Sequence, residues 1–309
     1  MALARKAFLA ASRNKWLAER FMRRPFARRA VRKFMPGEEL ADALGAAKAL
    51  VPDRIGTIIT RLGETLTGES QADAVRDHYL GAFDEIKRHE LPTVVSVKPT
   101  QLGLDHSIDA CREHLDVLAR KAVDTGSQLW IDMEDSSYVD RTLMLYRELK
   151  TKYPPVGIAI QAYLRRTPQD INNLLDVNPM IRLVKGAYLE PPDVAFPSKR
   201  DVDQQFASQG ERLLEAARDG RAHPIFGTHD MTLVRHLIAR ATATRVTQRQ
   251  YEVHMLYGIR ASEQRALAAE GQTVRCLISY GSQWFPWYMR RLAERPANVW
   301  FVLRTAFTR

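Results

Sequence analysis

The stretch of sequence that decides the fold begins with the apolar run VGIAIQ (156–161). It continues through the amphipathic run PQDINNLLD (168–176) and ends in a second apolar run, MIRLVK (180–185). Apolar runs of this length are typical of buried strands, and a helical segment between two of them predicts a parallel β-α-β unit. Thr167 and Pro168 support the helix start, because threonine caps helices and proline fits the first helical position.

The same alternation of short apolar runs and longer amphipathic runs continues along the chain. The predicted strands are Ile55–Arg61, Thr93–Lys98, Gln128–Met133, Val156–Gln161, Met180–Lys185, His223–Thr228, Gln248–His254 and Thr273–Ile278. The predicted helices are 69–88, 106–125, 139–151, 168–176, 199–218, 230–243, 261–270 and 283–294. Eight β/α pairs predict a closed (β/α)8 TIM-type barrel. An open doubly wound sheet is the alternative, but it predicts a glycine-rich phosphate loop, and neither GxGxxG nor GxxxxGKS/T occurs.

The positive charge of the chain is concentrated at its N-terminus. The 309 residues carry a net charge of +10, and residues 1–35 contain eleven Lys or Arg against one acid, Glu19. The remaining residues contain 35 basic and 35 acidic side chains, so the excess belongs to an arm. We expect a basic helical arm, 1–50, and a barrel, 51–309. Such an arm suits packing on the barrel, contact with an anionic membrane surface, targeting, or nucleic-acid binding.

Several function classes find no support in the sequence. Cys111 and Cys276 have no CxxC partner, which argues against a disulfide scaffold and structural zinc and favours a reducing compartment. No apolar run approaches the roughly 18–20 residues that a spanning helix needs. HExxH and GxSxG do not occur, and Glu134 and Asp135 are adjacent, so they cannot flank a glycosidic bond. Cations and amides without an evident catalytic acid or nucleophile suggest that a cofactor performs the difficult step.

Polar residues gather where the predicted strands end, which is where barrel enzymes build their active sites. The polar residues at these ends are Lys98, Asp132, Gln161, Lys185, Thr228 and His229. Structural roles are the alternative. Lys98 and Asp132 could simply pair. Gln161 could satisfy loop backbone, and His229 with Asp230 could cap a helix. A Schiff-base lysine at a strand end, as in aldolases, is a further alternative.

Two adjacent arginines lie on a short amphipathic helix near the C-terminus. Trp287, Arg290, Arg291 and Glu294 have the i, i+3, i+4, i+7 spacing of one helix face, and Pro296 limits the helix. Paired guanidinium groups suit a carboxylate, and Glu294 could hold Arg290 in place. On spacing alone, a solvated Arg–Glu pair worth about 0.3–0.5 kcal/mol is the simpler explanation.

Seven sequence blocks favour the carboxylate clamp over the solvated Arg–Glu pair. They are SVK (96–98), IDMEDSSY (131–138), IQAY (160–163), RLVKGAY (182–188), FGTHD (226–230), MLYGIR (255–260) and YMRRLAERP (288–296). In this order they resemble the monofunctional bacterial proline dehydrogenases, over roughly residues 34–305. The resemblance implies a distorted (β/α)8 barrel with an N-terminal helical extension and its last helix over the barrel mouth. It also implies oxidation of L-proline to 1-pyrroline-5-carboxylate by hydride transfer from C5 to N5 of FAD, with electrons passed to a membrane quinone.

The resemblance assigns a substrate site and a cofactor site, and no metal. The substrate-site residues are Lys98, Asp132, Leu256, Leu277, Trp287, Arg290, Arg291 and Glu294. The FAD-site residues are Gln161, Arg182, Val184, Lys185, Gly186, Ala187, Thr228 and His229. Arg290 and Arg291 would bind the substrate carboxylate, with Glu294 orienting them. Arg182 would reach the flavin near N5, and Gln161 would bond its pyrimidine edge.

The remaining implied roles surround these groups. Lys98 would lie on the carboxylate side, Asp132 at the substrate end, and Leu256 on the substrate ring. The segment 184–187 would line the isoalloxazine. Thr228 and His229 would contact the ribose and phosphate region, which completes the implied FAD site.

Four positions depart from the family's usual pattern. Leu277 and Trp287 stand where its proline enzymes usually carry tyrosines, and His254 and Pro99 are further substitutions beside motif positions. Hydroxyproline-oxidising relatives also lack the first tyrosine but carry a small polar residue there. The alternative is therefore oxidation of hydroxyproline or another cyclic or N-alkyl amino acid, or a catalytically weakened flavoprotein.

The location and partners follow from the same resemblance. We expect a cytoplasmic protein that binds proline or an analogue and transfers electrons to a quinone. The basic arm gives a hypothesis of peripheral contact with the inner face of the cell membrane. We expect no nucleic-acid partner, because no aromatic and basic interleaving typical of RNA platforms occurs beyond the arm.

Overall fold

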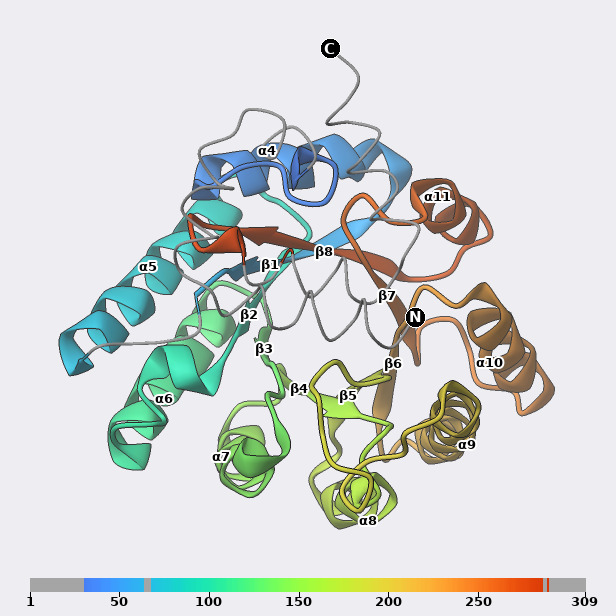
Figure 1. Ribbon diagram of the computed structural model, residues 1–309. Helices are drawn as coiled ribbons and strands as arrows, with labels where there is room; N and C mark the ends of the chain where they lie inside the picture. Colours follow the sequence, from blue (N-terminus) through green and yellow to red (C-terminus); the bar gives the residue numbers. More distant parts are fainter. Residues whose placement is uncertain (1–30, 64–67, 286–287, 289–309) are drawn as a thin grey trace, which may run out of the picture.

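A closed barrel of eight parallel strands forms the centre of the protein, with helices around it (Figure 1). The computed structural model describes residues 31–63, 68–285 and 288. The strands are β1 Gly56–Arg61, β2 Thr93–Val97, β3 Leu129–Ile131, β4 Val156–Gln161, β5 Met180–Val184, β6 His223–Gly227, β7 Glu252–Leu256 and β8 Val274–Tyr280. Each pairs in parallel with its sequence neighbours, and β8 pairs with β1. The predicted (β/α)8 barrel is confirmed.

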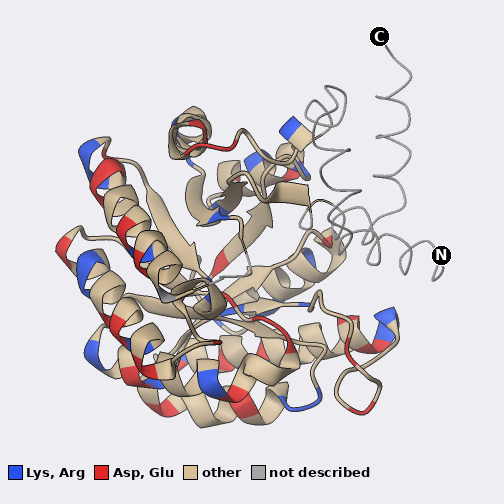
Figure 2. Ribbon diagram, turned by 60° about the vertical axis from the view of Figure 1, so that its left-hand side comes forward, with Lys and Arg blue, Asp and Glu red and all other residues tan. Residues whose placement is uncertain are grey.

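The helices that cover the barrel follow the predicted order. They are α4 Leu40–Leu50, α5 Glu69–Arg88, α6 Ile108–Asp124, α7 Val139–Lys152, α8 Thr167–Leu174, α9 Lys199–Arg218, α10 Met231–Ala243 and α11 Ala261–Ala269. The bounds of α5 and α9 agree with the prediction. Charges of both signs are interspersed on these outer helices (Figure 2), as expected from the balanced composition after residue 35.

The sequence prediction placed the start of β7 incorrectly. The predicted strand ran over 248–254, whereas β7 begins at Glu252. The preceding residues form a turn, in which the Thr247 backbone N–H and hydroxyl donate to Gln250 Oε1 at 2.9 and 3.0 Å. Gln250 Nε2 also donates to the Ala217 carbonyl at 2.8 Å. These polar side chains satisfy turn backbone, which an apolar-run criterion does not detect.

One predicted helix cap was also wrong. Thr167 is the first residue of α8 rather than its cap, and its hydroxyl donates to the Gln161 carbonyl at 2.5 Å. On α6, Ser107 is the cap, and its hydroxyl accepts from the Ala110 N–H. The Thr167 contact ties the end of β4 to the helix that follows it.

The hydrophobic core has two layers separated by the barrel wall. Between strands and helices lies the larger layer, which includes Phe83, Leu115 and Tyr146. The smaller layer fills the barrel interior with Ile58, Val94, Trp130 and Ile225, against which Met180 and Leu277 pack. Because side chains alternate across a strand, positions two residues further along also face inward. These positions include Ser96, Asp132 and Arg182, which follow Val94, Trp130 and Met180 and are polar.

Residues 34–38 lie against Trp284 and Tyr288 at one end of the barrel. The Phe34 and Tyr288 ring centroids lie 6.3 Å apart, and Trp284 Nε1 donates to Glu38 Oε1 at 3.1 Å. Trp284 and Tyr288 are buried and belong to the start of the predicted last helix. Its later residues, including Trp287, Arg290, Arg291 and Glu294, lie outside the described residues, as do residues 1–30 of the predicted arm. Within the described part of that arm, α4 packs against β8 and β1.

A close backbone approach fixes the N-terminal segment over the end of β7. Gly258, just after β7, has φ +73°, and a Cβ at this position would lie 1.6 Å from the Lys33 carbonyl oxygen. Only glycine accommodates both this conformation and this approach. Gly258 therefore holds residues 31–38 close to the strand ends, beside the start of the last helix.

We expect Gly258→Ala to lower the free energy of unfolding by at least about 2 kcal/mol, because it combines backbone strain with a backbone clash. Urea denaturation measures the change. Gly81→Ala is the matched control: Gly81 lies inside α5 with nothing within 4 Å of an added Cβ, so this variant should gain about 0.5–1 kcal/mol. Equal stability of Gly258→Ala and the wild-type protein would contradict the close approach of Lys33 to Gly258.

Candidate active site

The structure brings the described predicted site residues to one end of the barrel. Asp132 and Lys98 directly follow β3 and β2, Gln161 and Leu256 end β4 and β7, and Thr228 follows β6. This C-terminal end is where barrel enzymes place their reacting groups. The four predicted residues after position 286 lie outside the described part, so their relation to this end stays a prediction.

A buried ion pair occupies the centre of the site. The Arg182 side chain, on β5, forms an ion pair with Asp132, and Arg182 Nη2 donates to Ser96 Oγ at 3.1 Å. Ser96 Oγ in turn donates to Asp132 Oδ1 at 2.9 Å. Burial lowers the pKa of the Arg182 guanidinium, and the Asp132 carboxylate opposes that shift. Strands β2, β3 and β5 thus hold one cation against one anion, which gives the guanidinium a fixed orientation.

Two buried polar atoms beside this ion pair have no partner among the described residues. They are Arg182 Nη1 and Gln161 Oε1, on the neighbouring strands β5 and β4. Gln161 is 3% exposed. Its main-chain carbonyl, and not its side-chain oxygen, accepts from the Leu164 N–H at 3.3 Å and from the Thr167 hydroxyl at 2.5 Å. A buried donor and a buried acceptor that both lack partners indicate a place for a polar group from outside the chain.

Lys98 stands on a turn that a buried carboxylate anchors. The turn Pro99–Leu102 follows Lys98, and Glu134 accepts hydrogen bonds from the Thr100 N–H at 3.1 Å and the Thr100 hydroxyl at 2.7 Å. The side chain of Lys98 is half-buried and forms no ion pair within the described part of the chain. Among these residues, the ammonium group has no anionic partner.

The segment after β5 is shaped by a tyrosine. Gly186 has φ +110°, and a Cβ at this position would lie 2.2 Å from the ring of Tyr163. The Tyr163 N–H donates to the Lys185 carbonyl at 3.0 Å, and its carbonyl accepts from Phe196 N–H at 2.9 Å. Packing against Tyr163 is thus one physical reason for glycine here, beside the predicted approach of a flat ring.

His229 connects the ends of two strands. Its Nε2 accepts a hydrogen bond from the Leu256 N–H at 2.9 Å, which leaves Nδ1 as the protonated nitrogen of the neutral ring. The Thr228 hydroxyl oxygen accepts from Asp230 N–H at 3.2 Å. Both predicted cofactor residues are therefore fixed at the start of α10, where helix N–H groups attract anions.

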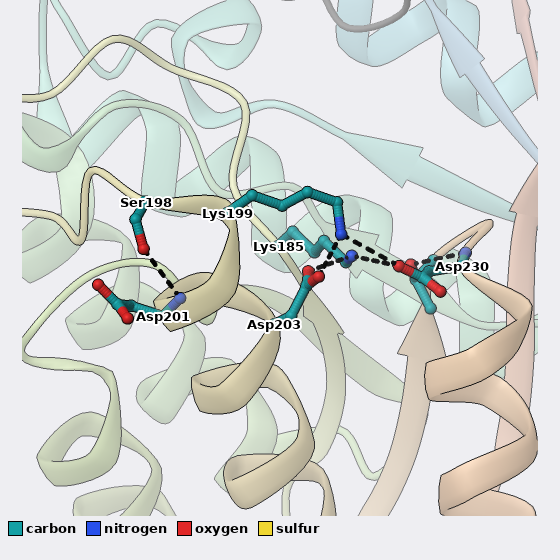
Figure 3. Close-up of polar contacts among 7 residues, drawn as sticks. Lys185, Ser198, Lys199, Asp201, Asp203 and Asp230 are labelled. Atoms are coloured by element: carbon teal, nitrogen blue, oxygen red, sulfur yellow. Dashed lines mark hydrogen bonds and ion pairs between the residues drawn. The ribbon is translucent and has the colours of Figure 1, made fainter.

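Lys185 belongs to a cluster of two lysines and two aspartates (Figure 3). Its Nζ lies 2.5 Å from Asp203 Oδ1 and 3.0 Å from Asp230 Oδ2, and Lys199 pairs with the same two carboxylates. Burial alone raises the pKa of Asp230, but the hydrogen bond from Lys185 and the two lysine charges lower it overall. The cluster joins β5, α9 and α10. Because two carboxylates engage its Nζ, Lys185 is poorly placed to act as a Schiff-base lysine.

The apolar part of the site comes from adjacent strands. Leu256, at the end of β7, is in register with Leu277 on β8, and both are half-buried. Leu277 also packs on the interior layer that contains Ile58 and Trp130. These two leucines form an apolar wall next to the polar positions of β2 to β5.

Sequence reasoning missed several residues that build this site. Ser96 and Trp130 lie two positions before Lys98 and Asp132, so strand alternation could have placed them on the same inward face. Asp203 and Lys199 lie on α9, and no short-range signal joins them to Lys185. No group of side chains suited to a metal ion occurs among the described residues. No helix of the described segments is long and apolar enough to cross a bilayer.

Comparison with known proteins identifies the family of this chain. The family model described as proline dehydrogenase matches residues 43–304. Proline dehydrogenase 1 of Bacillus subtilis (strain 168) is 36% identical over 302 residues, which cover 98% of both chains. The proline dehydrogenase of Deinococcus radiodurans is 33% identical over 277 residues, with 88% of each chain covered.

A solved structure supports the fold independently. The crystal structure of proline utilization A (PutA) from Bdellovibrio bacteriovorus, inactivated by N-propargylglycine, superposes with a TM-score of 0.79 at 24% sequence identity. The match covers 87% of this chain and 33% of that larger one. On the family model and the sequence identities together, this chain belongs to the proline dehydrogenase family.

Proposed function

We propose that this protein oxidises L-proline to 1-pyrroline-5-carboxylate with FAD as its cofactor. Family membership supports proline oxidation in proline catabolism. One structural observation supports the cofactor: Arg182 Nη1 and Gln161 Oε1, both buried, lack partners among the described residues. The edge of a flavin ring offers acceptors for the first and an N–H donor for the second. A flavin beside β4 and β5 would satisfy both atoms, which would otherwise be costly to bury.

The proposed cofactor site runs along the ends of β4, β5 and β6. Gln161 and Arg182 would bond the flavin ring, and the backbone of 184–187 would lie along it. Thr228 and His229, at the N-terminus of α10, would face the ribose and phosphates. The cluster of Lys185, Lys199, Asp203 and Asp230 would hold β5 and α10 at a constant separation.

The proposed substrate site lies beside the flavin position. Lys98, with no ion pair among the described residues, would attract the substrate carboxylate together with Arg290 and Arg291, which Glu294 would orient. Asp132 would lie at the substrate end. Leu256, Leu277 and Trp287 would surround the substrate ring.

The proposed chemistry is mainly positioning. When bound, FAD supplies N5 as the acceptor of the hydride that leaves proline C5, and the proline nitrogen releases a proton. The carboxylate clamp would keep the ring at the required place, since a displacement of about 1 Å can reduce the rate about 10²-fold. The fixed charge of Arg182 would stabilise the negative charge that develops during transfer.

A second substrate class is favoured by the apolar wall of Leu256 and Leu277. A leucine in the place of the family's usual tyrosine changes the shape of the ring pocket and removes a hydroxyl. We therefore include cyclic or N-alkyl amino acids other than proline, such as hydroxyproline, as the alternative substrates. The carboxylate clamp would serve them equally.

The basic arm, 1–50, carries a separate proposal about electron transfer. We propose that its first 30 residues attach the protein to the anionic inner face of the cell membrane, where a quinone would take the electrons, while 51–309 form the catalytic barrel. The support is the charge distribution: the whole net charge of +10 lies within residues 1–35. Each Lys or Arg near an anionic surface contributes about 1 kcal/mol to binding.

The first test is spectroscopic. The purified protein should show flavin absorbance in the visible range, and anaerobic addition of L-proline should bleach it as the flavin is reduced. Gln161→Leu should weaken FAD binding to the apoprotein about tenfold, because one hydrogen bond of about 1.4 kcal/mol is lost. Fluorescence titration measures this affinity.

Gln209→Leu is the matched control for this test. Gln209 also has a buried Oε1 without a partner in the described part, but it lies on α9, outside the barrel. Its replacement should leave FAD affinity unchanged. A colourless protein that takes up no FAD would refute the proposal, and a yellow protein that no cyclic amino acid bleaches would indicate a weakened flavoprotein.

Leu277→Ala tests the ring pocket. Removing this side chain should raise the ratio of kcat/KM for pipecolate, which has one more methylene, to that for proline by about tenfold. Steady-state rates with proline, hydroxyproline, pipecolate and sarcosine measure the preference. Ile278→Ala is the control, since Ile278 packs toward the helices and should change stability without changing the ratio. An unchanged ratio in Leu277→Ala would remove Leu277 from the pocket.

Deletion of residues 1–30 tests the arm. Binding to phosphatidylserine vesicles should fall more than tenfold, and quinone turnover at these vesicles should fall with it. Replacing the nine basic residues of this segment with glutamine should have the same effect if charge is the cause. Turnover with a soluble acceptor should stay unchanged. Vesicle binding that survives the deletion would refute membrane attachment through the arm.

A further inference from the structure

A column of four side chains runs through the barrel interior and ends at the arginine of the ion pair. Glu252 and His254 belong to β7, Trp130 to β3 and Arg182 to β5, and all four are buried. Each touches the next: His254 Nε2 lies 3.0 Å from Glu252 Oε2, the His254 and Trp130 ring centroids are 5.7 Å apart, and Arg182 Cζ lies 5.2 Å from the Trp130 ring centre. The column therefore connects the lower interior to the guanidinium at the candidate site.

The lower end of the column is fixed by charge. Glu252 accepts from Arg275 Nε at 2.8 Å and lies 3.4 Å from His223 Nε2. A carboxylate only accepts, so the Nε2 of His254 that faces Glu252 carries a proton. Burial lowers the pKa of His254 to about 4, against the opposing effect of Glu252. His254 is thus a neutral ring in a single tautomer at neutral pH.

Trp130, in the middle of the column, is contacted on several sides. His254 meets it at an interplanar angle of 73°, an edge-on arrangement, and Trp130 Nε1 donates to Gln128 Oε1 at 3.0 Å. On β4, a Cβ at Gly157 would lie 2.6 Å from the indole ring, so the glycine makes room for it. Trp130 is therefore held from several directions, and the Arg182 guanidinium rests on a surface that cannot move easily.

We propose that His254 is a positioning residue: through Trp130, it fixes the Arg182 guanidinium against the flavin and thereby raises the flavin's reduction potential. This inference rests on the proposed FAD site. A cation at a constant place beside the ring stabilises the negative charge of the reduced form. If Trp130 shifts into space left by a smaller residue at 254, the guanidinium withdraws and the reduced form is less stable.

The test compares the reduction potential of bound FAD in three variants. His254→Ala should change the two-electron reduction equilibrium about tenfold toward oxidised flavin, which corresponds to a potential about 30 mV lower. His254→Phe keeps a ring against Trp130 and should restore most of this loss. His223→Gln alters another partner of Glu252 that makes no ring contact with Trp130, and it should leave the potential unchanged.

The outcomes separate positioning from a purely structural role. A structural role predicts that His254→Ala lowers the melting temperature while the potential stays at the wild-type value, and this result would overturn the proposal. Equal shifts in His254→Ala and His223→Gln would also overturn it, since they would indicate a general effect of the Glu252 charge. A shift in His254→Ala that His254→Phe reverses supports it.

A second measurement needs no cofactor. His254→Ala and Arg182→Lys, alone and combined, form a double-mutant cycle in urea unfolding of the apoprotein. Non-additive effects support the link through Trp130, and additive effects contradict it. If the wild-type protein takes up no flavin, the proposed function fails by that fact, whereas the link between His254 and Arg182 is still decided by the cycle.

Discussion

The candidate site depends on a buried ion pair in the upper interior of the barrel, next to the apolar cluster that contains Ile58 and Trp130. Arg182 and Asp132 are brought together from β5 and β3, with Ser96 from β2 bonded to both. Removing either partner alone would leave an uncompensated charge away from water, which costs several kcal/mol. Close-packed hydrophobic residues of similar volume would give the same fold without the cost of removing two charges from water. The pair is therefore better explained by what a fixed, desolvated guanidinium offers to a ligand than by stability.

The architecture could be predicted from sequence because it follows from local periodicity. The strand 156–161 and the helices 69–88 and 199–218 were placed at their observed bounds, since long periodic segments carry a strong signal. Inward positions such as Lys98 and Asp132 followed from the ends of the strands. The error at β7 arose where polar side chains, led by Gln250, satisfy a turn that the apolar pattern does not mark.

What sequence could not supply is the set of long-range partners. Lys185 meets Asp203 from α9 and Asp230 from the start of α10, and nothing in the spacing of these residues joins them. The ring of Tyr163, from the preceding β/α loop, lies against Gly186, and sequence did not predict this contact. Such contacts are set by how the loops fold over the strand ends, which is a property of the assembled barrel.

The polar and apolar sides of the candidate site differ in how readily a side chain can be replaced. The polar side, from β2 to β5, holds charges whose positions are coupled: Asp132 orients Arg182, and Glu134 holds the turn after Lys98. A substitution there disturbs several groups together. The apolar side, on β7 and β8, consists of Leu256 and Leu277, whose contacts are non-directional. Packing tolerates a change of side chain better than a buried ion pair does. Under the proposed function, substrate preference would therefore change on the apolar side while the reaction chemistry on the polar side is retained. Leu277, which the resemblance places where the family usually carries tyrosine, lies on the side where such a change would cost least.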